Sequence, residues 1–236
     1  MAIAVINDHS IHYETAGVAD FRLRTPALLL HGNGENMHVF DRFVPLLSSS
    51  RGFVLMDSRY QGESEPLDPD AEVSLSYEAM ADDALKLMED VLGVTEYDVI
   101  GSSDGAIVAL LMALRSIRVR RLILVGLNTD PSGLKPKTAR AIKHELKLCE
   151  RRRDGEGAAL CRMMLTGPHI TGADLASIIC ETTVVYGKKD ECVRREQSEG
   201  AANAIPRGSF VEFKTAGHDV VRTHPSELAE LVRSLL

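Results

Sequence analysis

Short apolar runs alternate with longer stretches of helical periodicity along most of the chain. The apolar runs predict eight strands, at residues 3–6, 11–14, 27–30, 53–56, 98–100, 122–125, 183–186 and 210–213. The inner runs ALLL, FVLM, LILV and TVVY do not alternate with polar residues, as expected of parallel strands that helices cover on both faces. Helical patterns follow at residues 37–48, 75–92, 103–116, 194–204 and 226–236. This order predicts an α/β fold with a mostly parallel, eight-stranded sheet, whose first two strands form an antiparallel hairpin at one edge.

One interval breaks this alternation. Between residues 127 and 177 no strand pattern appears, and the segment 135–165 predicts two helices instead. Helices inserted between two strands of such a sheet occupy the position of a lid or cap. We therefore expect one core formed by residues 1–127 and 178–236, with residues 128–177 as a small helical cap.

The composition fits one globular domain and narrows the range of partners. A chain of 236 residues suffices for one large core, whereas two separate cores would each approach the lower size limit. The net charge of -7 disfavours nucleic acid as a partner, because phosphate binding depends on a basic surface. No apolar run approaches the length of a membrane span, and the first residues lack the basic region of a secretory signal. We therefore expect a cytoplasmic protein with no membrane partner.

The sharpest chemical signal is the motif Gly101-Ser102-Ser103-Asp104-Gly105. It follows the strand pattern YDVI and opens the helical pattern AIVALLMAL, which is the context of a G-x-S-x-G nucleophile elbow. Such a turn strains the backbone of Ser103 and exposes its hydroxyl, and a side chain at either glycine would collide with neighbouring elements. The alternative interpretation is a Gly/Ser turn that only caps a helix. Ser103 is the candidate nucleophile.

A serine hydroxyl becomes a strong nucleophile only when a base accepts its proton and an acid orients that base. His218 lies just after the last predicted strand and is the candidate base. Asp190 lies just beyond the preceding predicted strand and is the candidate acid. Because both follow the carboxyl ends of strands, we expect them at the same sheet edge as Ser103.

These segments resemble the α/β-hydrolase superfamily, and the resemblance covers nearly the whole chain. His31-Gly32-Asn33-Gly34 resembles the family's HGxG oxyanion loop. The segment DSRYQGES at residues 57–64 resembles the family's D-x-R-G-x-G-x-S, with Tyr60 in place of the first glycine. The resemblance implies a Ser103-Asp190-His218 triad, and it assigns the backbone N–H groups of Asn33 and Asp104 to an oxyanion hole.

The resemblance also implies a serine hydrolase, with carboxylic-ester hydrolysis as the default reaction. A small-molecule ester would be the substrate, and the acyl group would pass through Ser103 to water. A C–C hydrolase or a lyase of the same fold remains an alternative, because fold and triad do not fix the reaction. A receptor that binds a small ligand with little turnover is a second alternative. No cofactor or metal is implied, and the sequence does not predict the oligomeric state.

Two carboxylates leave questions open at the sequence level. Asp130 also lies just beyond a predicted strand and competes with Asp190 for the role of the acid. Asp104 places a carboxylate beside the oxyanion hole, where its charge would repel the developing oxyanion. Either the Asp104 side chain points away from the site or it has a function of its own.

Positive charge gathers on one side of the first helix predicted in the cap, at Lys137, Arg140, Lys143, Lys147 and Arg151. An apolar stripe on the same helix runs from Ala139 to Cys149. The basic side is either a solvated surface over a buried stripe or a surface that attracts anionic substrates.

Overall fold

The computed structural model describes residues 2–18 and 25–235. Within them, nine strands form one sheet. The strands are β1 (Ala2–Ile6), β2 (His9–Gly17), β3 (Ala27–Leu30), β4 (Gly52–Met56), β5 (Glu65–Pro66), β6 (Tyr97–Ser102), β7 (Val119–Val125), β8 (Glu181–Gly187) and β9 (Gly208–Phe213). All eight predicted strands are present, and the ninth is the two-residue β5, which pairs with β2.

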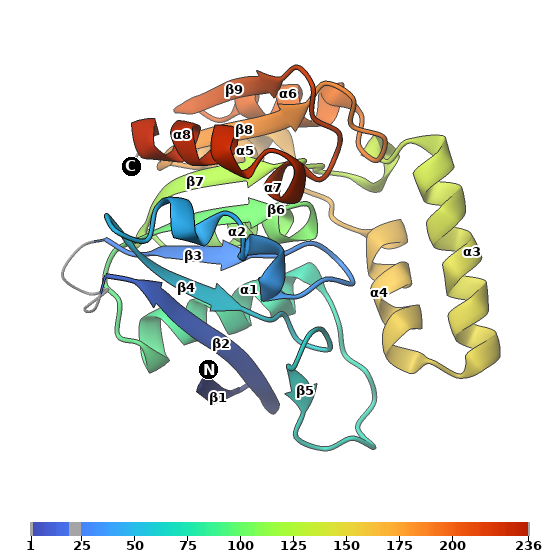
Figure 1. Ribbon diagram of the computed structural model, residues 1–236. Helices are drawn as coiled ribbons and strands as arrows, with labels where there is room; N and C mark the ends of the chain where they lie inside the picture. Colours follow the sequence, from blue (N-terminus) through green and yellow to red (C-terminus); the bar gives the residue numbers. More distant parts are fainter. Residues whose placement is uncertain (1, 19–24, 236) are drawn as a thin grey trace.

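The sheet has the strand order β1-β2-β4-β3-β6-β7-β8-β9. The predicted hairpin of β1 and β2 lies at one edge, and β2 pairs antiparallel with β4. From β4 through β9 every pairing is parallel. The carboxyl ends of these six strands therefore meet at a single edge of the sheet (Figure 1).

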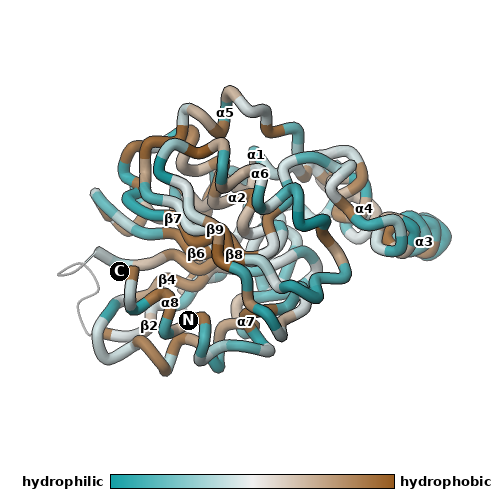
Figure 2. The backbone as a smooth tube through the Cα atoms, turned by 90° about the horizontal axis from the view of Figure 1, so that it is seen from above, coloured by the Kyte–Doolittle hydropathy of each residue, from teal (hydrophilic) through white to brown (hydrophobic). Residues whose placement is uncertain are grey.

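Helices cover both faces of the sheet, as the uninterrupted apolar strands predict. One face carries α1 (Tyr77–Lys86), the π turn η3 (Leu87–Val91), α2 (Asp104–Ala113), α5 (Gly172–Ser177) and α6 (Arg195–Ala204). The other carries the 3-10 turns η1 (Met37–Phe40) and η2 (Val44–Leu46), with α7 (Val220–Thr223) and α8 (Pro225–Leu235). Figure 2 shows the two layers of helices on opposite sides of the apolar strands.

Each inner strand contributes to two separate cores. In β3, for example, Leu28 and Leu30 pack into the core under α1 and α2, whereas Leu29 packs into the core under α8. Successive side chains of a strand point to opposite faces, so burial on both faces requires an apolar residue at every position.

The interval between β7 and β8 contains the two predicted helices. They are α3 (Pro136–Arg152) and α4 (Gly155–Thr166), preceded by the short turn η4 (Pro131–Gly133). Arg153 adopts a left-handed conformation with φ 59°, which ends α3, and Asp154 caps the start of α4. Both helices stand beyond the carboxyl edge of the sheet (Figure 1).

Two predicted helices differ from the observed ones for local reasons. The pattern at residues 37–48 forms two 3-10 turns instead of one helix, and Pro45 opens the second of them. The helix predicted from residue 75 begins at Tyr77, because the Ser76 side chain caps it by accepting a hydrogen bond from Ala79 N at 3.1 Å. Among the described residues, no helix combines the length and the apolar character that crossing a bilayer requires.

Candidate active site

Ser103 lies at a sharp turn between β6 and α2. Its backbone has φ 53° and ψ −119°, which is unfavourable for a residue with a side chain. A Cβ atom at Gly101 would lie 2.2 Å from Gly105 O, and one at Gly105 would lie 2.2 Å from Leu30 O. Neither position has room for a side chain, so the glycines allow the turn that the sequence predicts.

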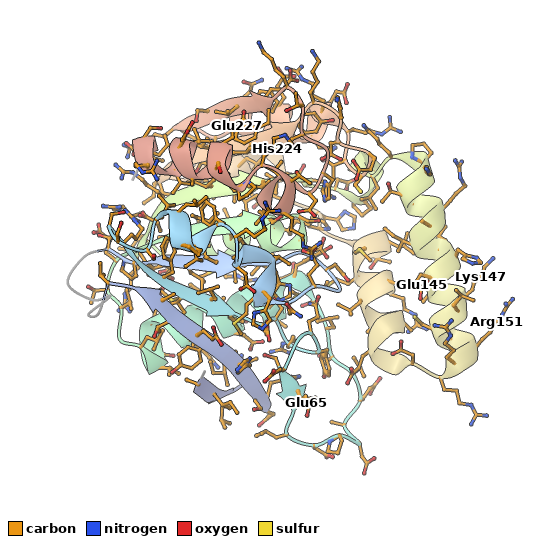
Figure 3. All side chains as sticks on the ribbon, in the orientation of Figure 1. Glu65, Glu145, Lys147, Arg151, His224 and Glu227 are labelled. Carbon is orange, nitrogen blue, oxygen red and sulfur yellow. The ribbon has the colours of Figure 1, made fainter. Side chains whose placement is uncertain are left out.

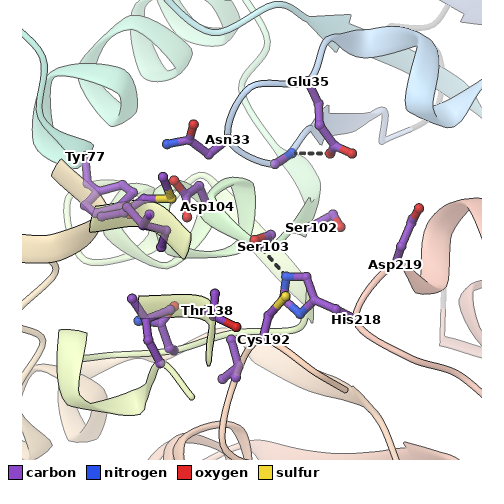
Figure 4. A pocket seen from close by; sticks show the side chains of 16 residues that line it. Asn33, Glu35, Tyr77, Ser102, Ser103, Asp104, Thr138, Cys192, His218 and Asp219 are labelled. Carbon is purple, nitrogen blue, oxygen red and sulfur yellow. Dashed lines mark hydrogen bonds between the residues drawn. The ribbon is translucent and has the colours of Figure 1, made fainter. Parts of the chain in front are cut away.

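His218 reaches Ser103 from the loop after β9. Its Nε2 lies 2.9 Å from Ser103 Oγ (Figure 4), and its Nδ1 lies 2.8 Å from Asp190 Oδ2. The imidazole packs against Gly126, where a Cβ atom would lie 2.8 Å from His218 Cε1. The structure thus brings the three candidate residues together in one hydrogen-bonded chain.

Asp190 lies buried in the loop after β8, between exposed neighbours. Its side chain is fully buried, and its Oδ1 accepts hydrogen bonds from Cys192 N at 2.7 Å and Val193 N at 2.8 Å. The other oxygen, Oδ2, is therefore directed at His218. Two backbone donors fix the orientation of the carboxylate, and the carboxylate in turn fixes that of the imidazole.

Burial and the neighbouring carboxylates shift the pKa of His218 in opposite directions. Burial lowers the pKa, but the hydrogen bond and the charge of Asp190 raise it, together with the charges of Glu191 and Asp104. The net result is a pKa above the ordinary value of 6.5. A base of this kind is matched to proton transfer near neutral pH.

The loop after β3 passes beside Ser103. His31 is buried and neutral: burial lowers its pKa, its Nε2 accepts from Ser58 N at 3.0 Å, and its Nδ1 therefore donates to Gly32 O at 2.7 Å. A Cβ atom at Gly32 would lie 3.2 Å from Ser103 Cβ, so the loop passes directly over the serine. The next N–H along this loop belongs to Asn33.

The second candidate donor is the N–H of Asp104, the first residue of α2. The first N–H groups of a helix have no partner within the helix, which leaves this one available. The predicted pair of donors thus comes from two elements that meet at Ser103.

The segment at residues 57–64 stabilises the candidate oxyanion loop, residues 31–34, and the turn after it through hydrogen bonds. Asp57 accepts hydrogen bonds from Met37 N at 2.7 Å and from Glu63 N at 2.9 Å. Gln61 Oε1 accepts from Gly34 N at 2.6 Å. Tyr60 has φ 59°, so it adopts the left-handed conformation for which the family's glycine is suited.

A pocket of about 210 Å³ opens above Ser103. Its lining combines the candidates Asn33, Ser103, Asp104 and His218 with several residues that sequence analysis did not identify: Tyr77, Asn128, Leu134, Thr138, Ile142, Met164, Cys192 and Val193. They come from α1, from the loops after β7 and β8, and from α3 and α4. Of these eight residues, only Ile142 belongs to a pattern visible in the sequence, the apolar stripe of α3.

Asp104 lies in this pocket with its carboxylate buried. The residue is 5% exposed, and Figure 4 shows its side chain between Ser103 and Tyr77, near Asn33. Burial raises its pKa to about 6, although Asn33, Tyr77 and His218 each act in the opposite direction. The side chain therefore does not point away from the site.

Asp130 lies apart from His218. Its Oδ1 accepts from Ser132 N at 2.9 Å, its Oδ2 contacts His169 Nδ1 at 3.0 Å, and these contacts lower its pKa. The structure pairs the imidazole of His218 with Asp190 instead.

The basic side chains of α3 lie on its exposed surface. The helix contributes Thr138 and Ile142 to the pocket, and none of its lysines and arginines is among the described residues that line it. Figure 3 shows Lys147 and Arg151 on the side of α3 that faces away from the sheet.

One group of side chains in the site has the composition of a metal site. Ligand atoms of Asp190, Cys192 and His218 lie within 4.8 Å of one another. A metal ion there would have to replace the hydrogen bond between Asp190 and His218. Burial, followed by the charges of Asp190 and Glu191, raises the pKa of Cys192 to about 11, so its thiol is a weak ligand near neutral pH.

The sequence matches a family model described as the alpha/beta hydrolase fold over residues 25–156, more than half of the chain. The chain belongs to the α/β-hydrolase fold family. The α/β-hydrolase fold predicted from the sequence is thereby confirmed.

Known proteins similar to this α/β hydrolase include several with hydrolase names. A 2-hydroxymuconate semialdehyde hydrolase from Pseudomonas sp. (strain CF600) is 25% identical over 89% of this chain and 86% of its own length. A fluoroacetate dehalogenase from Burkholderia sp. is 36% identical over 37% of this chain, a match that spans only 29% of the dehalogenase. The structure of a thermophilic esterase from Thermogutta terrifontis superimposes with a TM-score of 0.79 at 22% identity, over 96% of this chain and 93% of the esterase. These similarities support a hydrolase.

Proposed function

We propose that this α/β hydrolase cleaves small carboxylic esters through an acyl-enzyme on Ser103. The observation that carries the proposal is the hydrogen-bonded chain from Asp190 through His218 to Ser103, which ends at the floor of the pocket. A serine whose proton can pass to an oriented imidazole is a nucleophile for carbonyl carbon.

The geometry supports a two-step reaction. Ser103 Oγ attacks the ester carbonyl while His218 Nε2 takes the serine proton, and the N–H groups of Asn33 and Asp104 stabilise the oxyanion. His218 then protonates the leaving alcohol as the C–O bond breaks, which leaves an acyl-Ser103. Water, deprotonated by His218, attacks this acyl group, and the returning proton frees Ser103 and the carboxylic acid.

The proposed cap comprises residues 128–177, as the sequence predicts. From this cap, five residues line the pocket: Asn128, Leu134, Thr138, Ile142 and Met164. These side chains restrict the space above the nucleophile, and a pocket of about 210 Å³ limits the substrate to a small molecule.

Carbon–halogen cleavage fits this site less well, despite the match to a dehalogenase. Displacement of a halide by Ser103 Oγ would form an ether between the enzyme and the substrate. An ether has no carbonyl carbon for water to attack, so the enzyme would not turn over. The same oxygen attached to an acyl group forms an ester, which water can hydrolyse.

A C–C hydrolase is the second candidate, and one comparison favours it. The relative named 2-hydroxymuconate semialdehyde hydrolase aligns over nearly the full length of both chains. The same nucleophile and base could serve a carbon leaving group, provided that the bond to be broken adjoins a carbonyl. The two candidates therefore differ in the leaving group and share the site.

The test combines labelling with turnover. A fluorophosphonate probe should label the wild-type protein and leave Ser103→Ala unlabelled, and p-nitrophenyl acetate should be hydrolysed by the wild type alone. A protein that is labelled but turns over no ester would instead be assayed with 2-hydroxymuconate semialdehyde for C–C cleavage. Absence of labelling and of both activities would reject the hydrolase proposal and favour a receptor.

A further inference from the structure

The carboxylate of Asp104 takes no part in the reaction proposed above, although it lies beside the nucleophile. The residue is 5% exposed and contributes to the lining of the pocket. Within residues 2–18 and 25–235, its Oδ2 has no hydrogen-bond partner. A buried, unpaired carboxylate oxygen is costly to maintain unless something else in the functional cycle uses it.

The neighbours of Asp104 that line the pocket include no lysine or arginine among the described residues. Asn33 Nδ2 is also buried and has no hydrogen-bond partner among the described residues. Tyr77 and Asn33 stabilise the carboxylate as polar neighbours, but neither carries a positive charge. His218, whose charge lowers the pKa of Asp104, already pairs with Asp190.

The other carboxylates of the pocket have a cationic partner. Arg222 contacts Glu35 Oε1 at 2.7 Å and Asp219 Oδ2 at 3.3 Å. Neither Lys nor Arg is among the described residues that line the pocket itself. Asp104 is thus the acidic group of this lining for which the described residues supply no cation.

We propose that the side chain of Asp104 forms a cation subsite, which binds an ammonium group of the substrate close to the scissile carbonyl. This inference rests on the proposed function and names the class of ester. A bound cation would pair with the buried carboxylate, and it would also offset the repulsion between that carboxylate and the oxyanion that forms at the neighbouring N–H groups. A hydroxyl group of the substrate could fill the hydrogen-bonding position but could not offset that repulsion.

The charge state of Asp104 is consistent with this role. Burial raises its pKa to about 6, so most of the carboxylate is ionised at pH 7. An ammonium group in the pocket would favour the ionised form further. The exposed basic residues of α3 do not line the pocket, so they are not direct neighbours of the bound cation.

Two matched pairs of esters test the proposal at pH 7. Ethyl glycinate and ethyl propanoate differ by an ammonium group in place of a methyl group on the acyl side. Protonated 2-(dimethylamino)ethyl acetate and isopentyl acetate have the same shape on the alcohol side, and a protonated nitrogen replaces a C–H group. The wild type should favour the cationic member of one pair by about 10- to 100-fold in kcat/KM, and the pair that responds identifies the side that Asp104 contacts.

The variant Asp104→Asn keeps the backbone N–H and the shape of the side chain while it removes the charge. It should reduce the preference for the cationic ester to within about threefold, mainly through a lower kcat/KM for that ester. The matched control is Asp219→Asn. It removes a carboxylate charge from the same pocket, but this carboxylate already pairs with Arg222. This control should retain the preference. A wild type without preference in either pair, or an Asp104→Asn variant that keeps the preference, would overturn the proposal.

Binding to Ser103→Ala separates this inference from the proposed function. This variant cannot form the acyl-enzyme, so calorimetry measures the affinity for each ester without turnover. The cationic member should bind at least about tenfold more tightly than its neutral partner, and the difference should vanish in Ser103→Ala/Asp104→Asn. Equal affinities would reject the cation subsite even if the protein proves to be an esterase. A clear difference would support it even if the reaction proves to be C–C cleavage.

Discussion

Ser103 and Asp104 are neighbours in the chain, and each occupies a position that its own chemistry disfavours. Ser103 has a positive φ of 53°, and Asp104 buries a carboxylate of which one oxygen has no hydrogen-bond partner among the described residues. Strained backbone conformations and unpaired buried polar atoms are both found mainly at functional sites, because packing in the rest of the protein stabilises the fold against their cost. The G-x-S-x-G pattern predicts the strain at Ser103, but burial of Asp104 depends on Asn33 and Tyr77, which are distant in sequence.

Asp190 and Asp130, the two candidates for the catalytic acid, should differ sharply in their contribution to kcat. Asp190→Asn should lower kcat by roughly 10⁴-fold, because the amide favours the wrong tautomer of His218. Asp130→Asn should change kcat by less than about threefold, since its carboxylate contacts Ser132 and His169. Steady-state kinetics with p-nitrophenyl acetate measures both. A larger loss in Asp130→Asn would transfer the role of the acid to that residue.

The pH dependence of activity should follow the ionisation of His218. The imidazole must be neutral to accept the Ser103 proton, so kcat/KM should fall as pH falls through its pKa. Asp190, Glu191 and Asp104 raise this pKa above 6.5, and the midpoint should therefore lie above that value. Initial rates with a neutral ester between pH 5 and 9 give the profile. A midpoint well below 6.5 would show that these carboxylates do not dominate the environment of the base.

Asp104 should destabilise the fold at alkaline pH. Its pKa is about 6 in the folded protein against an ordinary 3.8, so the folded state binds the proton more tightly and stability falls as pH rises through that window. Asp104→Asn should thus raise the free energy of unfolding by about 3 kcal/mol at pH 8, and most of this gain should disappear by pH 4. Urea denaturation at both pH values measures it.

The control for this measurement is Asp130→Asn. Hydrogen bonds from Ser132 and His169 lower the pKa of Asp130, so removal of its charge should not stabilise the protein at pH 8. Stabilisation of both variants to the same extent would point to the net charge of the protein and would contradict a specific cost at Asp104.

At the scale of elements, the apolar periodicity locates strands and long helices, but local polar contacts set their ends. The eight strands were predictable because burial on both faces demands apolar residues at successive positions. The start of α1 and the split of residues 37–48 depend on Ser76 and Pro45, whose effects act over a single turn. The two-residue β5 has no periodicity to detect, because its pairing with β2 depends on how residues 57–64 fold back.

Helix α3 should contribute to the site through its apolar side and not through its charges. Ile142→Ala should enlarge the pocket and lower kcat/KM for short esters, whereas Lys143→Glu/Lys147→Glu should change kcat/KM by less than about threefold at 0.15 M salt. Kinetics with a neutral ester and a carboxylate-bearing analogue, at low and high salt, measures both variants. A salt-sensitive loss confined to the anionic ester would show that the basic residues attract anionic substrates after all.

At the scale of the whole molecule, the juxtaposition of Ser103, His218 and Asp190 was predictable and the pocket was not. Each of the three residues follows a strand that its own sequence reveals, and parallel strands bring their carboxyl ends to one edge. The pocket lining instead draws on residues from Gly32 to Asp219, and sequence patterns do not reveal how α3 and α4 lie over that edge. The substrate class therefore depends on side chains such as Tyr77 and Thr138, whose role appears only in three dimensions.

The opposite edge of the sheet contains a charge cluster that should stabilise the fold without affecting catalysis. Asp98, near the start of β6, is 1% exposed and forms ion pairs with Arg51 and Arg120. It lies five residues before Ser103 on an extended strand, which places it about 16 Å from the nucleophile. Asp98→Ala would leave the two guanidinium groups without this carboxylate and should lower the free energy of unfolding by roughly 3 kcal/mol.

Activity below the melting transition should nevertheless match that of the wild type, because the ends of the strands that hold Ser103, Asp190 and His218 are unchanged. Urea denaturation and kcat measured at low temperature separate the two effects. The matched comparison is Asp190→Asn, which should lose kcat by far more than its change in stability can explain. If Asp98→Ala lost kcat in proportion to its loss of stability, the two edges of the sheet would be coupled. A normal kcat with reduced stability would instead show that the amino ends of the strands stabilise the scaffold on which the carboxyl ends carry out the reaction.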